Sequence, residues 1–188
     1  MSAVYLLIVF ALWVGLSRAL WKGWRRWRAA EGGNRRARDA AALIIGVLWL
    51  GVSFWYAGGQ KIYYDMQVNR LCAIDGGIKV YETVRLPAER FDKYGNVRIP
   101  AKKDARPGDE YYYEVDYHYY RKGDPQMTRR QAQIIRRSDG KILGESISYS
   151  RGGGDLPGPW HGSSFICPPI SKDRPGLEVS IFLRGDEK

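Results

Sequence analysis

Two long apolar runs dominate the first 57 residues of the chain. Arg18 is the only charge in residues 3–21, AVYLLIVFALWVGLSRALW, and no charge occurs in residues 40–57, AAALIIGVLWLGVSFWYA. At about 1.5 Å per residue, helices of this length span roughly 27–29 Å, close to the ~30 Å hydrocarbon core of a bilayer. A buried core helix is the alternative, but such helices rarely run so far without a polar stripe. The pattern predicts a transmembrane hairpin over residues 1–58.

The positions of the basic residues predict the side of the membrane that each part occupies. Nothing basic precedes Ala3, so the first run lacks the charged start of a cleaved signal peptide and is expected to be a retained helix. Eight Lys or Arg lie in residues 18–38, whereas only Lys61 and Arg70 follow the second run over a similar distance. Short loops rich in basic residues stay in the cytoplasm. We therefore expect a bacterial inner-membrane protein with the loop 22–39 cytoplasmic and the N-terminus and residues 59–188 periplasmic.

Tryptophan and arginine alternate just after the first apolar run, at Trp21, Trp24, Trp27, Arg25, Arg26 and Arg28. Indole rings favour the membrane–water interface, and guanidinium groups bind lipid phosphates. Alternating arginines and aromatics also occur in proteins that bind single-stranded nucleic acid. Because six of the seven Trp lie in the first 55 residues, we favour an interfacial anchor and expect membrane lipids as partners.

Beyond the second run, the pattern predicts one helix followed by strands. Residues 60–74 have helical spacing, with Ile62, Tyr63, Met66, Val68 and Leu71 available for one face. Glycines at 76–77 are expected to end this helix, and glycines at 58–59 to separate it from the second span.

Strand-like alternation then recurs in five segments, residues 78–86, 110–122, 127–137, 142–150 and 177–184. The turn clusters Gly123-Asp124-Pro125 and Asp139-Gly140 fit hairpins between the middle three. We expect an α+β domain over residues 59–188, with the juxtamembrane helix packed on an antiparallel sheet of about five strands in a meander.

The net charge is distributed unevenly between the hairpin and the rest of the chain. The 188 residues carry 30 Lys+Arg against 20 Asp+Glu, a net of +10, and 45% are hydrophobic. The hydrophobic share argues against a disordered basic tail. Residues 59–188 hold 22 basic and 18 acidic residues, a net of 22 − 18 = +4. Most of the excess therefore belongs to the hairpin, and no nucleic acid is expected as a partner.

Two cysteines, Cys72 and Cys167, both fall in the domain expected outside the cytoplasm. An even number of cysteines in an oxidising compartment favours a disulfide over two buried thiols. Such a bond would close a loop of about 95 residues, for which the chain-entropy estimate is about 4–5 kcal/mol.

Catalytic signals are weak. The series Glu114, Asp116 and His118 lies on one strand, where alternate residues are ~6.5–7 Å apart, too far for all three to hold one ion. The second histidine, His161, lies near Ser163 but without a nucleophile-elbow pattern. We expect no catalytic residues, no metal and no cofactor; the alternative is a membrane-tethered periplasmic hydrolase that uses His161 and His118.

Residues 150–169, SRGGGDLPGPWHGSSFICPP, form the most unusual stretch and are expected to be a long irregular loop. Aromatic residues such as Trp160 are enriched at binding hot spots, so we assign a candidate binding set of Trp160, His161, Arg151 and Asp155. The alternative is a structural corner in which Trp160 closes the core. The leading functional hypothesis is a membrane-anchored periplasmic protein-interaction module, either an accessory subunit of an envelope complex or an immunity or exclusion factor. An oligomeric structural or pore-lining protein is a further possibility.

Overall fold

The computed structural model describes residues 2–30, 34–156, 162–169 and 175–185. The chain divides into two compact units: Met1–Lys61 with Gly154–Gly162, and Ile62–Gly153 with Ser163–Lys188. We refer to them below as the hairpin unit and the sheet domain, and each is described by itself.

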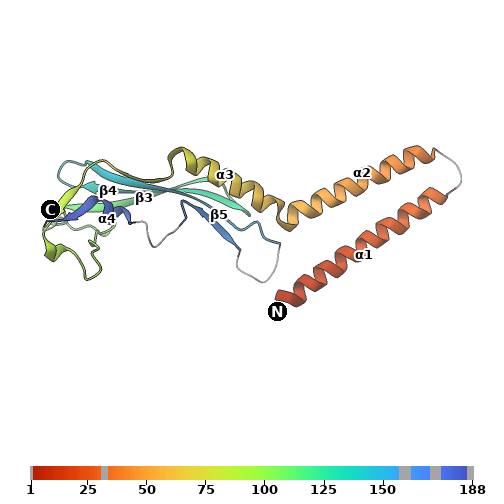
Figure 1. The fold of residues 1–188 in the computed structure, drawn as a ribbon, viewed down its shortest axis with the longest axis horizontal. Coiled ribbons are helices and arrows are strands. Elements are labelled where there is room, and N and C mark those ends of the chain that lie inside the picture. The colour runs from red at the N-terminus through yellow and green to blue at the C-terminus, as the bar shows by residue number, and fades with distance from the viewer. Residues whose placement is uncertain (1, 31–33, 157–161, 170–174, 186–188) are drawn as a thin grey trace. The chain divides into compact units, whose positions relative to one another are not determined.

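The hairpin unit contains two long apolar helices, α1 (Ser2–Ala29) and α2 (Arg35–Phe54) (Figure 1). Both are long and apolar enough to cross a membrane, judged by length and composition. The helices continue into the segment 22–39 expected as a loop, so most of that segment is helical instead. Arg, Lys and Ala are strong helix formers, which explains why the helices run past the apolar residues. Asn34 begins α2 by accepting a hydrogen bond from Arg36 N (3.0 Å) on its side chain.

A π-helical turn, η1 (Trp55–Gly59), follows α2 and contains Gly58 in a non-helical conformation (φ 171°, ψ −11°). Helix α3 (Gln60–Asp75) begins directly afterwards. The break predicted at glycines 58–59 and the end of the helix before Gly76 are both confirmed. A Cβ on Gly76 would lie 2.6 Å from Cys72 O, so only glycine fits this close turn.

Five antiparallel strands form the main sheet of the second unit: β1 (Gly77–Val80), β3 (Tyr111–Arg121), β4 (Gln126–Arg136), β5 (Ile142–Gly152) and β6 (Ser164–Cys167). Their order is β1-β5-β4-β3, and β6 also pairs with β5. The three long strands form the predicted meander with the predicted turns. Helix α3 lies along one face of this sheet (Figure 1).

Three segments differ from the sequence-based expectation. Residues 78–86 split between β1 and β2 (Val84–Leu86), because the chain leaves the main sheet after Val80. Residues 177–184 form a short helix, α4 (Leu177–Ile181), followed by β7 (Phe182–Arg184), which pairs in parallel with β2. Leu177 and Ile181 are both buried and four residues apart, a spacing that suits a helical turn. The end of β5 and the whole of β6 lie inside residues 150–169, so the described part of this stretch is partly strand rather than wholly irregular.

Two hydrophobic clusters stabilise the sheet domain. One cluster joins α3 to the sheet through Val68, Cys72, Met127, Ile147 and Tyr149. The other joins β2, β7 and α4 to the sheet through Leu86, Val97, Ile134, Leu143, Leu177, Ile181 and Phe182. The prediction of which α3 residues pack against the sheet was partly wrong. Tyr64, Val68, Leu71 and Cys72 contact the sheet, whereas Ile62, Tyr63 and Met66 are exposed.

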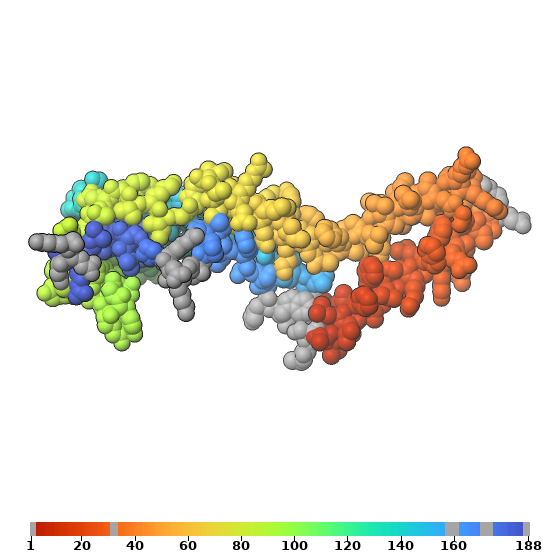
Figure 2. Space-filling view, viewed as in Figure 1, coloured from red at the N-terminus to blue at the C-terminus, as the bar shows by residue number. Residues whose placement is uncertain are grey.

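The segment between β2 and β3 begins with a short 3-10 helix, η2 (Ala88–Arg90), and contains no further helix or strand. It stands out from the surface of the sheet domain in the space-filling view (Figure 2). Tyr94 near its tip is highly exposed.

Candidate functional site

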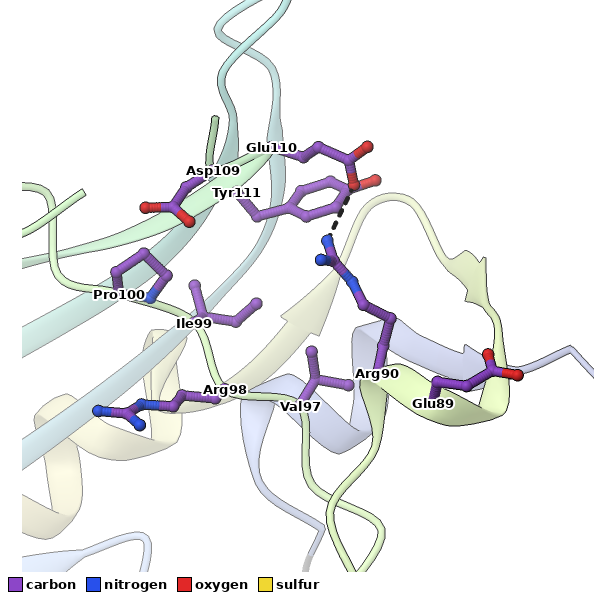
Figure 3. A pocket seen from close by; sticks show the side chains of 9 residues that line it. All are labelled: Glu89, Arg90, Val97, Arg98, Ile99, Pro100, Asp109, Glu110 and Tyr111. Atoms are coloured by element: carbon purple, nitrogen blue, oxygen red, sulfur yellow. Dashed lines mark hydrogen bonds and ion pairs between the residues drawn. The ribbon is translucent and has the colours of Figure 1, made fainter. Parts of the chain in front are cut away.

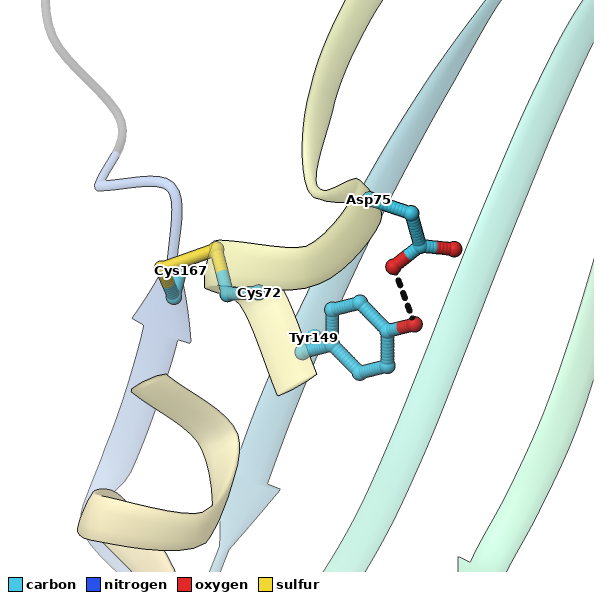
Figure 4. The surroundings of a disulfide bond; sticks show 4 residues. All are labelled: Cys72, Asp75, Tyr149 and Cys167. Atoms are coloured by element: carbon cyan, nitrogen blue, oxygen red, sulfur yellow. Dashed lines mark hydrogen bonds between the residues drawn. A yellow bond between two sulfur atoms is a disulfide. The ribbon is translucent and has the colours of Figure 1, made fainter. Parts of the chain in front are cut away.

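The predicted disulfide between Cys72 and Cys167 is present and joins α3 to β6, with Cα atoms 5.9 Å apart (Figure 4). Cys72 is itself buried in the cluster beneath α3. The bond therefore holds the last strand of the sheet against the helix that opens the domain.

A hydrogen-bonded triad fixes the other side of the helix end. The Tyr149 hydroxyl donates to Asp75 Oδ1 (2.6 Å), as Figure 4 shows. Arg129 Nη2 lies 3.3 Å from Asp75 Oδ2. Burial opposes ionisation of Asp75, but the bonds from Tyr149 and Arg129 outweigh it and lower the pKa of this carboxyl. Burial and the bond to Asp75 raise the pKa of the Tyr149 phenol. Both groups therefore keep their neutral-pH protonation states, which suits a structural tie.

Arg151 lies at the base of the loop that connects β5 to β6 and is only 3% exposed. Its Nε donates to Asp65 Oδ1 on α3 (2.6 Å), and its Nη1 donates to Gly153 O and to Ser163 O (3.1 Å). The guanidinium thus bonds both ends of the loop and the helix. Its role as a binding residue stays a prediction, and the contacts show that it ties Gly153 and Ser163 to α3.

The other predicted loop residues separate into two groups. In the hairpin unit, Asp155 forms an ion pair with Lys61 (2.5 Å), and Gln60 donates to Gly154 O (3.2 Å). Trp160 and His161 lie outside the described residues. Arg151 belongs to the sheet domain and Asp155 to the hairpin unit, so a shared role in binding stays a prediction.

Strand β3 is an edge strand of the main sheet, with β4 on one side only. Tyr113 donates its N–H to Pro100 O and accepts from Lys102 N, both at 2.9 Å, so its backbone groups face away from β4. In an antiparallel pair this orientation recurs at every second residue. The N–H and C=O groups of Val115, Tyr117 and Tyr119 therefore also face outward. Among the described residues, none of these groups has a hydrogen-bond partner.

Side chains along this edge alternate between two chemistries. Tyr117 and Tyr119 are 57% and 44% exposed and lie on the face away from α3. Asp116 and His118 point to the opposite face, where the His118 ring contacts Tyr120 (4.8 Å, edge-on). Glu114 is bonded to Lys102 Nζ (2.8 Å). Within the described ranges no group of three His, Cys, Asp or Glu side chains could hold a metal ion.

A small hollow of about 240 Å³ lies between the segment after β2 and the start of β3. Arg90 reaches across its mouth to Glu110 (3.1 Å), while Val97, Ile99 and Tyr111 form the wall (Figure 3). Glu89, Arg98 and Asp109 also line the hollow, so charges of both signs surround it.

The predicted lipid-interface residues occupy the last turns of α1. Trp21 and Trp24 pack together (4.7 Å), and Arg28 lies over the Trp24 ring (5.4 Å). Arg38 of α2 lies over Trp27 (5.8 Å) and donates to the carbonyl groups of Trp27 and Ala30. Arg28 also pairs with Asp39 (3.2 Å), while Arg25 and Arg26 are exposed. The cluster therefore fastens the turn of the hairpin and leaves part of its charge at the surface.

A reciprocal pair of hydrogen bonds between α1 and α2 was missed from the sequence. Trp13 Nε1 donates to Ser53 Oγ (2.9 Å), and Trp49 Nε1 donates to Ser17 Oγ (3.2 Å). The two helices carry nearly the same pentapeptide, WVGLS at 13–17 and WLGVS at 49–53. This internal repeat is the signal that could have revealed the contact.

Comparison with models of known protein families, with well-characterised proteins and with solved structures finds no match for this chain.

Proposed function

We propose that this chain is a membrane-anchored protein-binding module of the bacterial inner membrane, with its sheet domain in the periplasm. Two helices of spanning length support the anchor. The arginines of residues 18–38 favour a cytoplasmic position for the turn of the hairpin. The disulfide fits an oxidising compartment for the sheet domain.

The open edge of β3 carries the proposal of protein binding. An extended segment of another protein that pairs with Val115, Tyr117 and Tyr119 would satisfy their backbone groups and add a strand to the sheet. Main-chain bonds provide affinity in this mode, and alternate side chains provide specificity. The module would act as an accessory subunit of an envelope complex or as an immunity or exclusion factor.

The chemistry of the edge restricts the partner. On one face, the exposed rings of Tyr117 and Tyr119 favour apolar or aromatic side chains. On the other face, Asp116 favours a basic side chain directly opposite. We therefore expect an extended segment in which apolar and basic residues alternate.

Photo-crosslinking in the native membrane tests this edge. Tyr119 is replaced by the photoreactive amino acid benzoylphenylalanine, and irradiation is expected to give one discrete protein adduct. Tyr117→Pro is then combined with the photoreactive residue at position 119. It removes an outward N–H without disturbing a bond to β4, since proline is tolerated at strand edges. Loss of this bond and of strand geometry in the partner is expected to lower the adduct yield about tenfold.

Tyr117→Val is the matched control, because it removes the same ring but keeps the N–H. Benzoylphenylalanine in place of Tyr94, which is also exposed, should give no adduct. Equal yields for Tyr117→Pro and Tyr117→Val would contradict strand addition. A periplasm-only reporter fused after Lys188 is expected to be active in the same strain, and a silent reporter would overturn the location.

A further inference from the structure

A groove of about 430 Å³ lies between the first turns of α3 and the end of β3. All of its walls belong to the sheet domain. It is lined by Tyr63, Tyr64, Gln67, Leu71, Tyr120, Arg121 and Met127. Three tyrosines and one arginine thus surround an apolar floor, a composition that suits a ligand with both a charged and an apolar part.

Arg121 is the charged group of this groove. Its guanidinium lies over the Tyr64 ring (5.2 Å), and its Nε donates to Pro125 O (2.8 Å). Arg121 forms no salt bridge with any described acidic residue. The mouth of the groove is therefore positive, and Arg121 is held in place by its aromatic and backbone contacts.

The outward side of α3 next to this groove is apolar. Ile62 and Met66 are 56% and 59% exposed, and Tyr63 lies between them on the helix surface. Water is a poor environment for such a patch, whereas aliphatic and tyrosine side chains together are typical of the membrane interface. The exposed residues explain why the sequence suggested an apolar helix face that does not contact the sheet.

Chain length keeps the groove within reach of the bilayer. Tyr63 lies six positions after Ala57, the expected end of the second span. Six residue steps extend about 9 Å as a helix and at most about 22 Å as an extended chain. The headgroup layer adds about 5–8 Å on each side of the hydrocarbon core.

We propose that this groove binds phospholipid headgroups of the membrane that anchors the chain, with Arg121 on the phosphate and Ile62, Tyr63 and Met66 at the bilayer surface. The proposal rests on the membrane anchoring proposed above. Arginine is well suited to phosphate because it donates two parallel hydrogen bonds. This contact is separate from the Trp and Arg cluster at the other end of the hairpin helices, so the chain would have a lipid contact in each leaflet.

The test uses the full chain in nanodiscs of phosphatidylethanolamine and phosphatidylglycerol. A trace of phosphatidylglycerol carries a diazirine in its headgroup, and adducts are mapped after irradiation and trypsin digestion. Cleavage after Lys61 and Arg70 releases residues 62–70, which contain Tyr63 and Tyr64. We expect headgroup adducts on this peptide. Arg121→Gln should reduce them about fivefold, the effect of one basic residue near an anionic surface.

Arg130→Gln is the matched control, since it removes an exposed charge on the opposite face of the sheet and should leave the adducts unchanged. Lys122→Gln is a second control, because the Lys122 ammonium lies over the Tyr119 ring (5.9 Å) on the face of the sheet away from α3, and it should leave the adducts unchanged. Formation of the Cys72–Cys167 disulfide, read by nonreducing electrophoresis, confirms folding of each variant.

A second probe with the diazirine in the acyl chain separates the two proposals. Acyl adducts on residues 3–21 and 40–57 without headgroup adducts on residues 62–70 would overturn the groove but leave the anchor standing. Absence of acyl adducts from both apolar helices would overturn the anchor itself. Equal headgroup yields for Arg121→Gln, Lys122→Gln and Arg130→Gln would also refute the groove.

Discussion

The hairpin unit and the sheet domain are stabilised in different ways. Helices α1 and α2 expose their apolar side chains and contact each other through two indole–hydroxyl bonds and through Arg28 and Arg38. The sheet domain instead buries two apolar clusters and adds a disulfide. This difference in stabilising contacts is the one expected between a part suited to lipid and a part suited to water. In lipid, apolar surface gives no driving force between helices, so packing and polar contacts must hold them; in water, burial dominates.

Breaking the disulfide should have the largest effect and should affect the sheet domain alone. Replacing both cysteines with serine (Cys72→Ser and Cys167→Ser together) frees a loop of 95 residues. We expect the domain to lose about 4–5 kcal/mol of unfolding free energy. Urea denaturation followed by tyrosine fluorescence and protease resistance measures the loss.

The hairpin provides the internal control for this double variant. Its protection from protease in the membrane should not change, because the contacts between the described residues of α1 and α2 involve neither cysteine. Equal destabilisation of both parts would show that they do not fold independently.

Acid should weaken the sheet domain through the carboxyl at the end of α3. The folded pKa of Asp75 lies below its ordinary 3.8, so its contribution is complete at neutral pH and is lost as pH falls through the folded pKa. Hydrogen bonds from Tyr81 and Gln131, against the effect of burial, likewise lower the pKa of Glu145 from 4.5. Stability should therefore decline below about pH 4.5, as urea midpoints at several pH values would show.

Asp75→Asn isolates the Asp75 contribution. At pH 7 we expect the free energy of unfolding to fall by about 1–3 kcal/mol. The asparagine amide oxygen is a weaker, uncharged acceptor for the hydrogen bonds from Tyr149 and Arg129. At pH 2 the variant and the parent should differ much less. A difference independent of pH would contradict the ionic contribution.

The smallest effect is expected in the hairpin. Trp49→Phe and Ser17→Ala each remove one side of an interhelical bond, and a double-mutant cycle gives their coupling. We expect about 0.6 kcal/mol, the typical strength of such bonds between membrane helices. The coupling is measured from the association of α1 with α2 in micelles, read by energy transfer for each variant. A coupling of zero would mean that the bond contributes nothing.

The sequence predicted the features that depend on local pattern. Apolar runs gave the two helices, and Gly123-Asp124-Pro125 with Asp139-Gly140 located the hairpins between the long strands. The cysteine pair followed from number and compartment, without any geometric information.

The remaining features depend on tertiary contacts. Leu177 and Ile181 suit a helix or a strand equally well, and the choice follows from packing against Gly144, where a Cβ would lie 2.9 Å from Ile181 Cδ1. Similarly, Ile62 and Met66 are as apolar as Val68, so composition cannot tell which face of α3 meets the sheet. That β3 is an edge strand follows only from the strand order. The repeated WxGxS pentapeptides are visible in the sequence, but only the pairing of the helices shows that they form hydrogen bonds.

The bond between Cys72 and Cys167 also determines how the chain responds to mechanical load. It makes the stretch between these residues a covalent ring, which contains β1, β3, β4 and β5. Tension between the N-terminal helices and the chain end passes from one sulfur to the other and bypasses those strands. A pull on the two ends can therefore stretch only the segments before residue 72 and after residue 167, while the strands inside the ring, the edge of β3 included, stay folded under force.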